Sequence, residues 1–175
     1  LVRSIRDAGI DLAIMGGDAI GSESFQRQFV KMPSETRSPE HYTDGIYAAT
    51  FFISDISNRK ARQFSKTFKR RFGKKPDDMA ATHFDAAAIA VEAIRKAKIE
   101  IDLEQSRKNI RNQLSSFRYI ETAHKGITGR IFFDAHGNVI KPFPIGVYSQ
   151  GRLISAPTQL GPIVNLDNRR FAKGA

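Results

Sequence analysis

Two short apolar runs and three longer segments with helical periodicity dominate the pattern of hydrophobic and polar residues. The apolar runs, Leu12–Met15 and Gly45–Ile53, are bounded by turn residues, which is typical of buried, central strands in a sheet. The longer segments, at about residues 59–72, 80–98 and 103–117, place apolar residues three or four positions apart and predict amphipathic helices. This alternation predicts an α/β fold.

The remaining segments predict shorter elements. Residues 2–10 indicate the end of a helix, residues 22–32 a second short helix, and the polar residues 33–44 a loop. Two turn signals, Asp134–Gly137 and Gln150–Gly151, predict hairpins in the last third of the chain. The residues expected at helix ends are Gly9, Ser22 or Ser24, Gly73, and Asp77 or Asp78; those expected inside are Phe25, Phe29, Val30, Phe84, Ile89, Val91 and Ile94.

The loop Met15-Gly-Gly-Asp-Ala-Ile-Gly21 is the strongest candidate for a site. It follows an apolar run, and ligands of open α/β sheets bind in the crevice beyond the carboxyl ends of the strands. Its glycines allow the backbone to bend, so that Asp18 and the neighbouring amide groups can face such a crevice. The residues alone support equally well a structural role, in which Asp18 caps the next helix or closes a turn.

The charge of the chain suggests a further class of partner. The formal net charge is +10 and the pI is about 10.1, and a basic surface is the electrostatic mark of phosphate binding. However, most of the excess lies in residues 59–75, interleaved with the apolar face of a predicted helix. Such a run is usually the solvated side of an amphipathic helix, so no nucleic-acid partner is expected.

Neither a metal site nor a catalytic site is indicated. The sequence has no cysteine, which excludes disulfides, thiolate ligands and cysteine nucleophiles, and its four histidines stand singly. A P-loop lysine, a dinucleotide fingerprint and a nucleophile elbow are missing as well, so no cofactor and no enzymatic activity are expected. His83 and Asp85 could act as ligands or catalysts, but capping or satisfying the core is the favoured role.

Several stretches in a fixed order resemble one family. The Asp18 loop, the strand Gly45-Ile-Tyr-Ala-Ala-Thr50, the segment from Phe68 to Ala90 and the stretch Gly126-Ile-Thr-Gly-Arg-Ile-Phe-Phe-Asp134 are similar to the branched-chain amino acid substrate-binding proteins of ATP-binding cassette (ABC) transporters. The resemblance runs from Leu1 to about Leu160 and corresponds to the C-terminal half of such a protein. It implies part of a type I periplasmic binding protein fold, with two Rossmann-like three-layer α/β lobes.

This resemblance also implies a domain division and a site. Residues 1–52 would be the end of the second lobe, 53–141 the helical and hairpin part of the first, and 142–175 a return to the second lobe followed by the tail. An acidic residue at the position of Asp18 holds the ligand's ammonium group in amino-acid-binding members, which makes Asp18, with Gly17 and Ala19 beside it, the expected ligand-binding residues.

The implied function is extracytoplasmic binding of an amino acid, of the branched-chain type, for delivery to an ABC permease. The alternative is an extracellular sensor domain of a signalling receptor, because the same fold can be joined to membrane-spanning output domains. Localisation in the periplasm or outside the cell is expected in either case, and a secretion signal would precede Leu1. Half of such a fold would expose sheet edges and apolar faces, so self-association of the chain is a further expectation.

Overall fold

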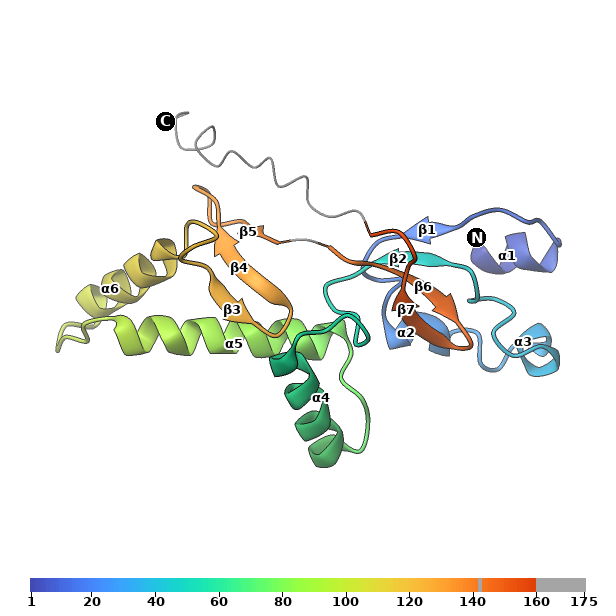
Figure 1. The fold of residues 1–175 in the computed structure, drawn as a ribbon, viewed down its shortest axis with the longest axis horizontal. Helices are drawn as coiled ribbons and strands as arrows, with labels where there is room; N and C mark the ends of the chain where they lie inside the picture. The colour runs from blue at the N-terminus through green and yellow to red at the C-terminus, as the bar shows by residue number, and fades with distance from the viewer. Residues whose placement is uncertain (142, 160–175) are drawn as a thin grey trace.

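The structure, a computed structural model, describes residues 1–141 and 143–159 (Figure 1). Its helices are α1 (Val2–Asp7), α2 (Glu23–Arg27), α3 (Pro33–Arg37), α4 (Arg59–Phe72), α5 (Asp78–Lys96) and α6 (Leu103–Ser116). Its strands are β1 (Met15–Gly16), β2 (Tyr47–Ala49), β3 (His124–Gly126), β4 (Gly129–Phe133), β5 (Val139–Ile140), β6 (Ile145–Ser149) and β7 (Arg152–Ser155). No helix in these ranges is long and apolar enough to cross a membrane.

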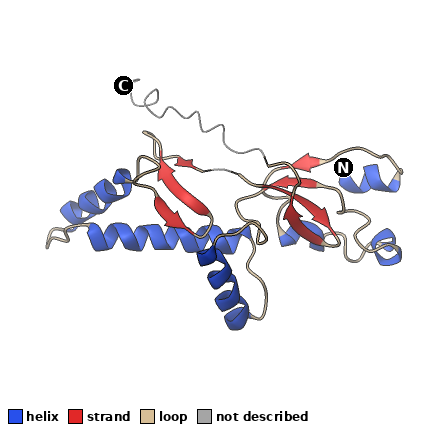
Figure 2. Cartoon of the chain, in the orientation of Figure 1, coloured by secondary structure: helices blue, strands red, loops and turns tan. Residues whose placement is uncertain are grey.

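One end of the elongated molecule is built on a mixed sheet with the order β1-β2-β6-β7 (Figures 1 and 2). Strand β1 runs parallel to β2, whereas β2 and β6, and β6 and β7, pair antiparallel. The predicted turn at Gln150–Gly151 joins β6 to β7, and both residues have positive φ values (51° and 67°), as a tight hairpin turn requires. The core between this sheet and the short helices is mostly aromatic. Its buried residues are Phe25, Phe29, Tyr42, Ile46 and Tyr148.

The other end consists of α4, α5 and α6 with the small antiparallel sheet β3-β4-β5 (Figure 2). Helices α5 and α6 pack together with β4 around a core formed by Ile89, Ala93, Phe117 and Ile131. The predicted turn Asp134–Gly137 connects β4 to β5: the backbone N–H of Asp134 donates to the carbonyl of Asn138 at 2.9 Å, and Gly137 has a φ of 85°. A second tight turn, at Ile127–Thr128 between β3 and β4, was not predicted.

Two segments of the chain join the two ends. One leads from β2 to α4 and the other from β5 back to β6 (Figure 1). They lie side by side, because the rings of Phe51 and Phe143 are 4.7 Å apart between centroids and the ammonium group of Lys141 lies 4.9 Å from the Phe51 ring centre. The two connecting segments therefore contact each other between the two ends of the molecule.

The helix ends follow from local chemistry. The side chains of Ser22, Asn58, Asp77 and Asp102 each accept a hydrogen bond from a backbone N–H in the first turn of the helix that follows. Gly73 ends α4 in the left-handed conformation (φ 73°) that favours glycine. The predicted caps at Ser22, Gly73 and Asp77 are thus confirmed.

Three predictions about the first sheet and its helices were wrong. The predicted buried strand Leu12–Met15 is instead a two-residue strand, β1, at the edge of the sheet, and Leu12 and Met15 are 55% and 58% exposed. Among the described strands it pairs only with β2, so its other edge has no neighbouring strand and these side chains are left exposed. The predicted loop 33–44 contains α3, which starts with a proline at its first position. Val30, expected inside, is 63% exposed because α2 ends at Arg27, before it.

The predicted inner face of α5 is buried only in part. Ile89 is 6% exposed, but Phe84, Val91 and Ile94 are each between 45% and 47% exposed. Helix α6 and strand β3 cover one side of α5, whereas the side that carries these three side chains is covered only in part: the ring of Phe64, from α4, lies 4.7 Å from that of Phe84 between centroids. The helix itself was predicted correctly, but the prediction that all four of these side chains are buried was wrong.

Candidate functional site

The Asp18 loop begins where β1 ends, and it presents its carboxylate to solvent. Gly17, Asp18 and Ala19 are all exposed. The backbone N–H of Ala19 donates to Oδ1 of Asp18 at 2.9 Å, so one carboxylate oxygen closes a local turn. No described residue donates to the other oxygen. Ser22, not Asp18, caps α2, so the structural role is limited to that turn and leaves one anionic oxygen free for a ligand.

The Asp18 loop contacts strand β6 and the end of strand β2. The phenol of Tyr148 donates to the carbonyl of Ile20 at 2.7 Å, with a longer contact of 3.4 Å to the carbonyl of Ser22. Gly21 lies so close to the end of β2 that a Cβ atom there would be 3.1 Å from the Cβ of Thr50. Burial and the negative charge of Asp78 raise the pKa of Tyr148 to about 12, so the phenol stays a donor. Sequence reasoning missed Tyr148 because an aromatic residue in a strand usually indicates core packing.

A second carboxylate lies near the loop, at the first position of α5. Asp77 caps this helix, whereas Asp78 is only 5% exposed. Burial raises the pKa of Asp78, and the neighbouring negative charges of Asp77 and Asp18 raise it further, against hydrogen bonds from the backbone N–H groups of Met79 and of Asp78 itself. Sequence reasoning treated Asp77 and Asp78 as alternative caps. The signal that could have identified Asp78 is the doublet itself, since one cap needs only one carboxylate.

Asp85 is a structural residue, as expected from the sequence. Its side chain is 2% exposed and accepts three hydrogen bonds from the β3–β4 turn: from the N–H of Ile127 (2.7 Å), the N–H of Thr128 (2.8 Å) and the hydroxyl of Thr128 (2.6 Å). The ammonium group of Lys141 donates to the same hydroxyl at 2.7 Å. Burial lowers the pKa of Lys141 to about 8, and the charge of Asp85 partly offsets this effect.

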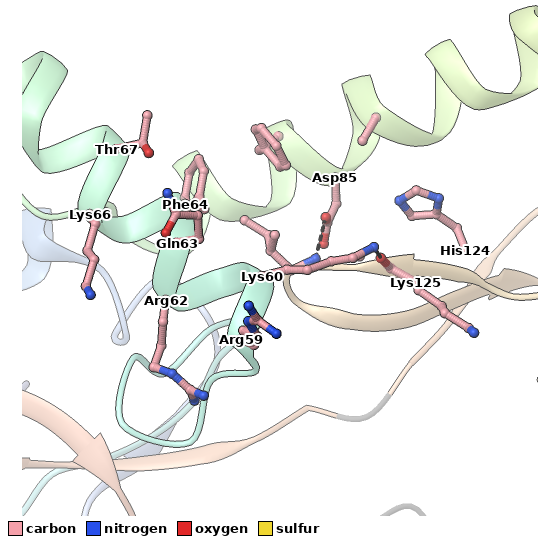
Figure 3. Close-up of a pocket in the computed structure, with 14 residues that line it drawn as sticks. Arg59, Lys60, Arg62, Gln63, Phe64, Lys66, Thr67, Asp85, His124 and Lys125 are labelled. Atoms are coloured by element: carbon pink, nitrogen blue, oxygen red, sulfur yellow. Dashed lines mark hydrogen bonds between the residues drawn. The ribbon is translucent and has the colours of Figure 1, made fainter.

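A basic groove lies between α4, α5 and β3, away from the Asp18 loop (Figure 3). Phe64 contributes to its apolar floor, and basic side chains of α4 stand at its rim. Two of these cations hold neighbouring backbone: Lys60 donates to the carbonyl of Lys125 at 2.9 Å, and Arg62 to that of Ser57 at 2.6 Å. The basic helix therefore uses part of its charge to hold its own surroundings.

Metal ligation finds no support in the described part of the chain, where no group of three or more His, Asp or Glu side chains could hold an ion. His83 is exposed and its Nδ1 lies 2.7 Å from the carbonyl of Met79, one turn earlier in α5. His124 is paired with Glu92, with 2.6 Å between Nδ1 and Oε2. These two histidines are thus engaged in local contacts within their own end of the molecule.

Comparison with solved structures shows the same fold in substrate-binding proteins. LivJ of Streptococcus pneumoniae, a branched-chain amino acid transporter substrate-binding protein in complex with isoleucine, is 23% identical with a TM-score of 0.70. The leucine-binding protein LivK of Thermotoga maritima is 22% identical with a TM-score of 0.71. The match covers 92% of this chain in both cases, and 40% and 41% of those proteins. A solute-binding protein of Rhodopseudomonas palustris in complex with benzoate is 18% identical with a TM-score of 0.58, over 91% of this chain and 38% of that one.

The chain spans about 40% of the length of the first two structures, so it carries part of the type I periplasmic binding protein fold. No curated protein matches the sequence. The family model described as "Periplasmic binding protein" matches residues 2–152, which is most of the chain. The family and these structural neighbours are substrate-binding proteins and not enzymes. The chain belongs to the periplasmic binding protein family.

Proposed function

We propose that this chain, within a protein of the length of its relatives, binds an amino acid of the branched-chain type outside the cytoplasm and delivers it to an ABC permease. The observation that carries the proposal is the exposed carboxylate of Asp18, which keeps one oxygen free at the end of β1. The family match supports ligand binding, and the isoleucine complex of LivJ and the name of the leucine-binding LivK support the ligand class.

The chemistry of the loop fits an ammonium group. A carboxylate accepts strong, charge-assisted hydrogen bonds from a protonated amine, and the glycines beside Asp18 leave space for the ligand to approach the backbone. Gly17 is exposed and directly precedes Asp18 in the sequence, whereas the N–H of Ala19 is already bonded to the Asp18 carboxylate. Gly17 therefore contributes open backbone to the site, and Ala19 contributes its methyl group.

The site works as one wall of a cleft between two lobes. We assign residues 1–52 and 143–159 to the second lobe and 53–141 to the first; residue 142 and residues 160–175 of the predicted division lie outside the described residues. The paired segments around Phe51 and Phe143 are then two of the crossings between the lobes. Lobes joined by a few crossings close around a ligand by hinge motion. This chain covers 40% and 41% of LivJ and LivK, and we expect the residues that hold the ligand's carboxylate in the part that it does not cover.

The test is a ligand screen on the protein of full family length, followed by a substitution. A panel of amino acids is screened by thermal shift, since a specific ligand raises the melting temperature by mass action. Calorimetry on Asp18→Ala should then show a loss on the order of 1.5–3 kcal/mol, or roughly 10-fold to 150-fold in affinity. Asp11→Ala serves as the matched control, because Asp11 is also an exposed aspartate but lies before β1, outside the Asp18 loop. An unchanged affinity in Asp18→Ala would remove Asp18 from the site.

A further inference from the structure

The N-terminus of α5 meets the Asp18 loop across the boundary between the two ends of the molecule. A single hollow is lined by Gly21 and Tyr148 from the end that carries Asp18, and by Pro76 and Asp77 from the end that carries α5. Gly21 belongs to the Asp18 loop, and the phenol of Tyr148 bonds that same loop. The first turn of α5 and the candidate ligand loop are therefore neighbours in space, although 60 positions separate Asp18 from Asp78 in the sequence.

The side chain of Asp78 is buried at this boundary without a counter-charge. Asp78 is 5% exposed, and its Oδ1 atom is buried with no hydrogen-bond partner among the described residues. The ionisable groups that interact with it are Asp18, Asp77 and the phenol of Tyr148, and none of the three is a cation. Lys74 and Lys75 line the same hollow, but neither forms an ion pair with Asp78 in the described part of the chain.

A second unpartnered acceptor lies next to the loop. Thr50, at the end of β2, is fully buried, and its Oγ1 atom has no hydrogen-bond partner within the described ranges. The backbone of Gly21 packs directly on the Thr50 side chain. Burying polar groups unpaired is costly, and a carboxylate costs most. Two such groups beside one loop indicate that a donor, and above all a cation, is missing from this boundary.

We propose that Asp78 is a second carboxylate for the ligand's ammonium group, so that the amino acid's positive charge is held between Asp18 of one lobe and Asp78 of the other. This inference rests on the proposed function, and it names the chemical feature that the ligand must have. An ammonium group carries three N–H donors, which one carboxylate oxygen of Asp18 cannot satisfy alone. Acids from both lobes, with the hydroxyl of Thr50, supply the acceptors that remain.

This arrangement couples ligand binding to closure of the cleft. Without the ligand, the like charges of Asp18 and Asp78 oppose the approach of the two lobes. With an ammonium group between them, the same charges attract it from both sides and favour the closed form. Because Oδ1 of Asp78 is covered here, the ligand must enter while the lobes are apart. The site then selects amino acids over acids that lack an amine, such as the benzoate bound by the Rhodopseudomonas palustris relative.

The test varies both the ligand and the residue at position 78, in a protein of the length of its relatives. Calorimetry compares the amino acid that gives the largest thermal shift with its α-hydroxy analogue, in which a hydroxyl replaces the ammonium group. The quantity of interest is the ratio of the two affinities, here called the amine preference. Asp78→Asn should lower the amine preference by about 10-fold or more, because a charge-assisted bond is lost. Asp77→Asn is the matched control: it removes one charge at the adjacent position, and asparagine still caps α5.

The outcomes separate the two proposals. An amine preference in Asp78→Asn within 3-fold of the wild type, while Asp18→Ala loses affinity, would overturn the role of Asp78 and leave the proposed function standing. A full-length protein that binds no amino acid would instead refute the proposed function. If Asp77→Asn lowers the amine preference as much as Asp78→Asn does, the effect comes from the loss of any nearby negative charge. The proposed direct contact between Asp78 and the ammonium group would then be wrong. Circular dichroism verifies folding, and Asp78→Ser takes the place of Asp78→Asn in the same comparison if that variant does not fold.

Discussion

Replacing Asp85 tests how the buried carboxylate organises the α5 end of the molecule. Asp85→Ala removes the acceptor for three hydrogen bonds from Ile127 and Thr128, of 2.6–2.8 Å, at a position that is 2% exposed. Two of the donors are backbone N–H groups, and each buried unpaired donor costs about 1–3 kcal/mol. We therefore expect a loss of about 3–5 kcal/mol in the free energy of unfolding.

The partner Asp85→Asn provides a graded version of the same test. Its carbonyl oxygen still accepts the N–H of Ile127, but its amide group offers a donor where the N–H of Thr128 needs an acceptor. The expected loss is about 1–3 kcal/mol, smaller than that of the alanine variant. His83→Ala is the control, because His83 is exposed on the same helix and bonds only the carbonyl of Met79. Its free energy of unfolding should stay within about 0.5 kcal/mol of the wild type.

Urea denaturation of the chain, followed by circular dichroism, measures these differences. Hydrogen exchange of the Ile127 and Thr128 amides gives a local measurement, since both amides should lose protection in Asp85→Ala before the rest of β4 does. A loss below about 1 kcal/mol together with unchanged protection at these two amides would refute the reasoning. It would mean that the turn finds other acceptors and that Asp85 does not organise it.

Two further predictions concern the ionisation of Lys141 and the exposed apolar faces. Burial lowers the pKa of Lys141 from 10.5 to about 8, so the unfolded chain binds more protons between these values, and the free energy of unfolding should rise as the pH increases from about 8 to about 10.5. Lys141→Met should remove this slope in urea titrations at each pH, and an unchanged slope would assign it to another group. The chain should also self-associate through its open edge at β1, seen as a mass in light scattering that grows with concentration and decreases in Met15→Lys. A stable monomer at high concentration would contradict this.

The local features of the fold could be predicted from the sequence because residues a few positions apart determine them. Ser22 and Asp77 cap their helices through backbone N–H groups three residues away, and Gly73 ends α4 because glycine tolerates a positive φ. The turn at Gln150–Gly151 follows the same logic. The structural role of Asp85 was predicted as well, although its partners on the β3–β4 turn, some 40 positions later, were not.

The candidate site was predicted only in part. Asp18 could be singled out because an apolar run, a glycine pair and one carboxylate are adjacent in the sequence, and the structure places that carboxylate in solvent at the end of β1. Its role in ligand binding stays a prediction. Tyr148 and Thr50 could not be assigned to the loop, because their contacts with Ile20 and Gly21 come from strands that pair only in the folded chain.

The sequence by itself determined the three long helices, the caps at Ser22, Gly73 and Asp77, the turns at Asp134–Gly137 and Gln150–Gly151, and the carboxylate at Asp18. Short-range backbone chemistry and hydrophobic periodicity specify these features. Only the tertiary structure decided which apolar faces are covered, and it left Leu12, Met15 and Phe84 exposed despite their apolar patterns. It also placed the buried Asp78, whose Oδ1 atom has no hydrogen-bond partner among the described residues, near a loop 60 residues earlier. The burial of a side chain and its distance from other charges depend on which elements meet in space. Local sequence patterns do not predict those contacts.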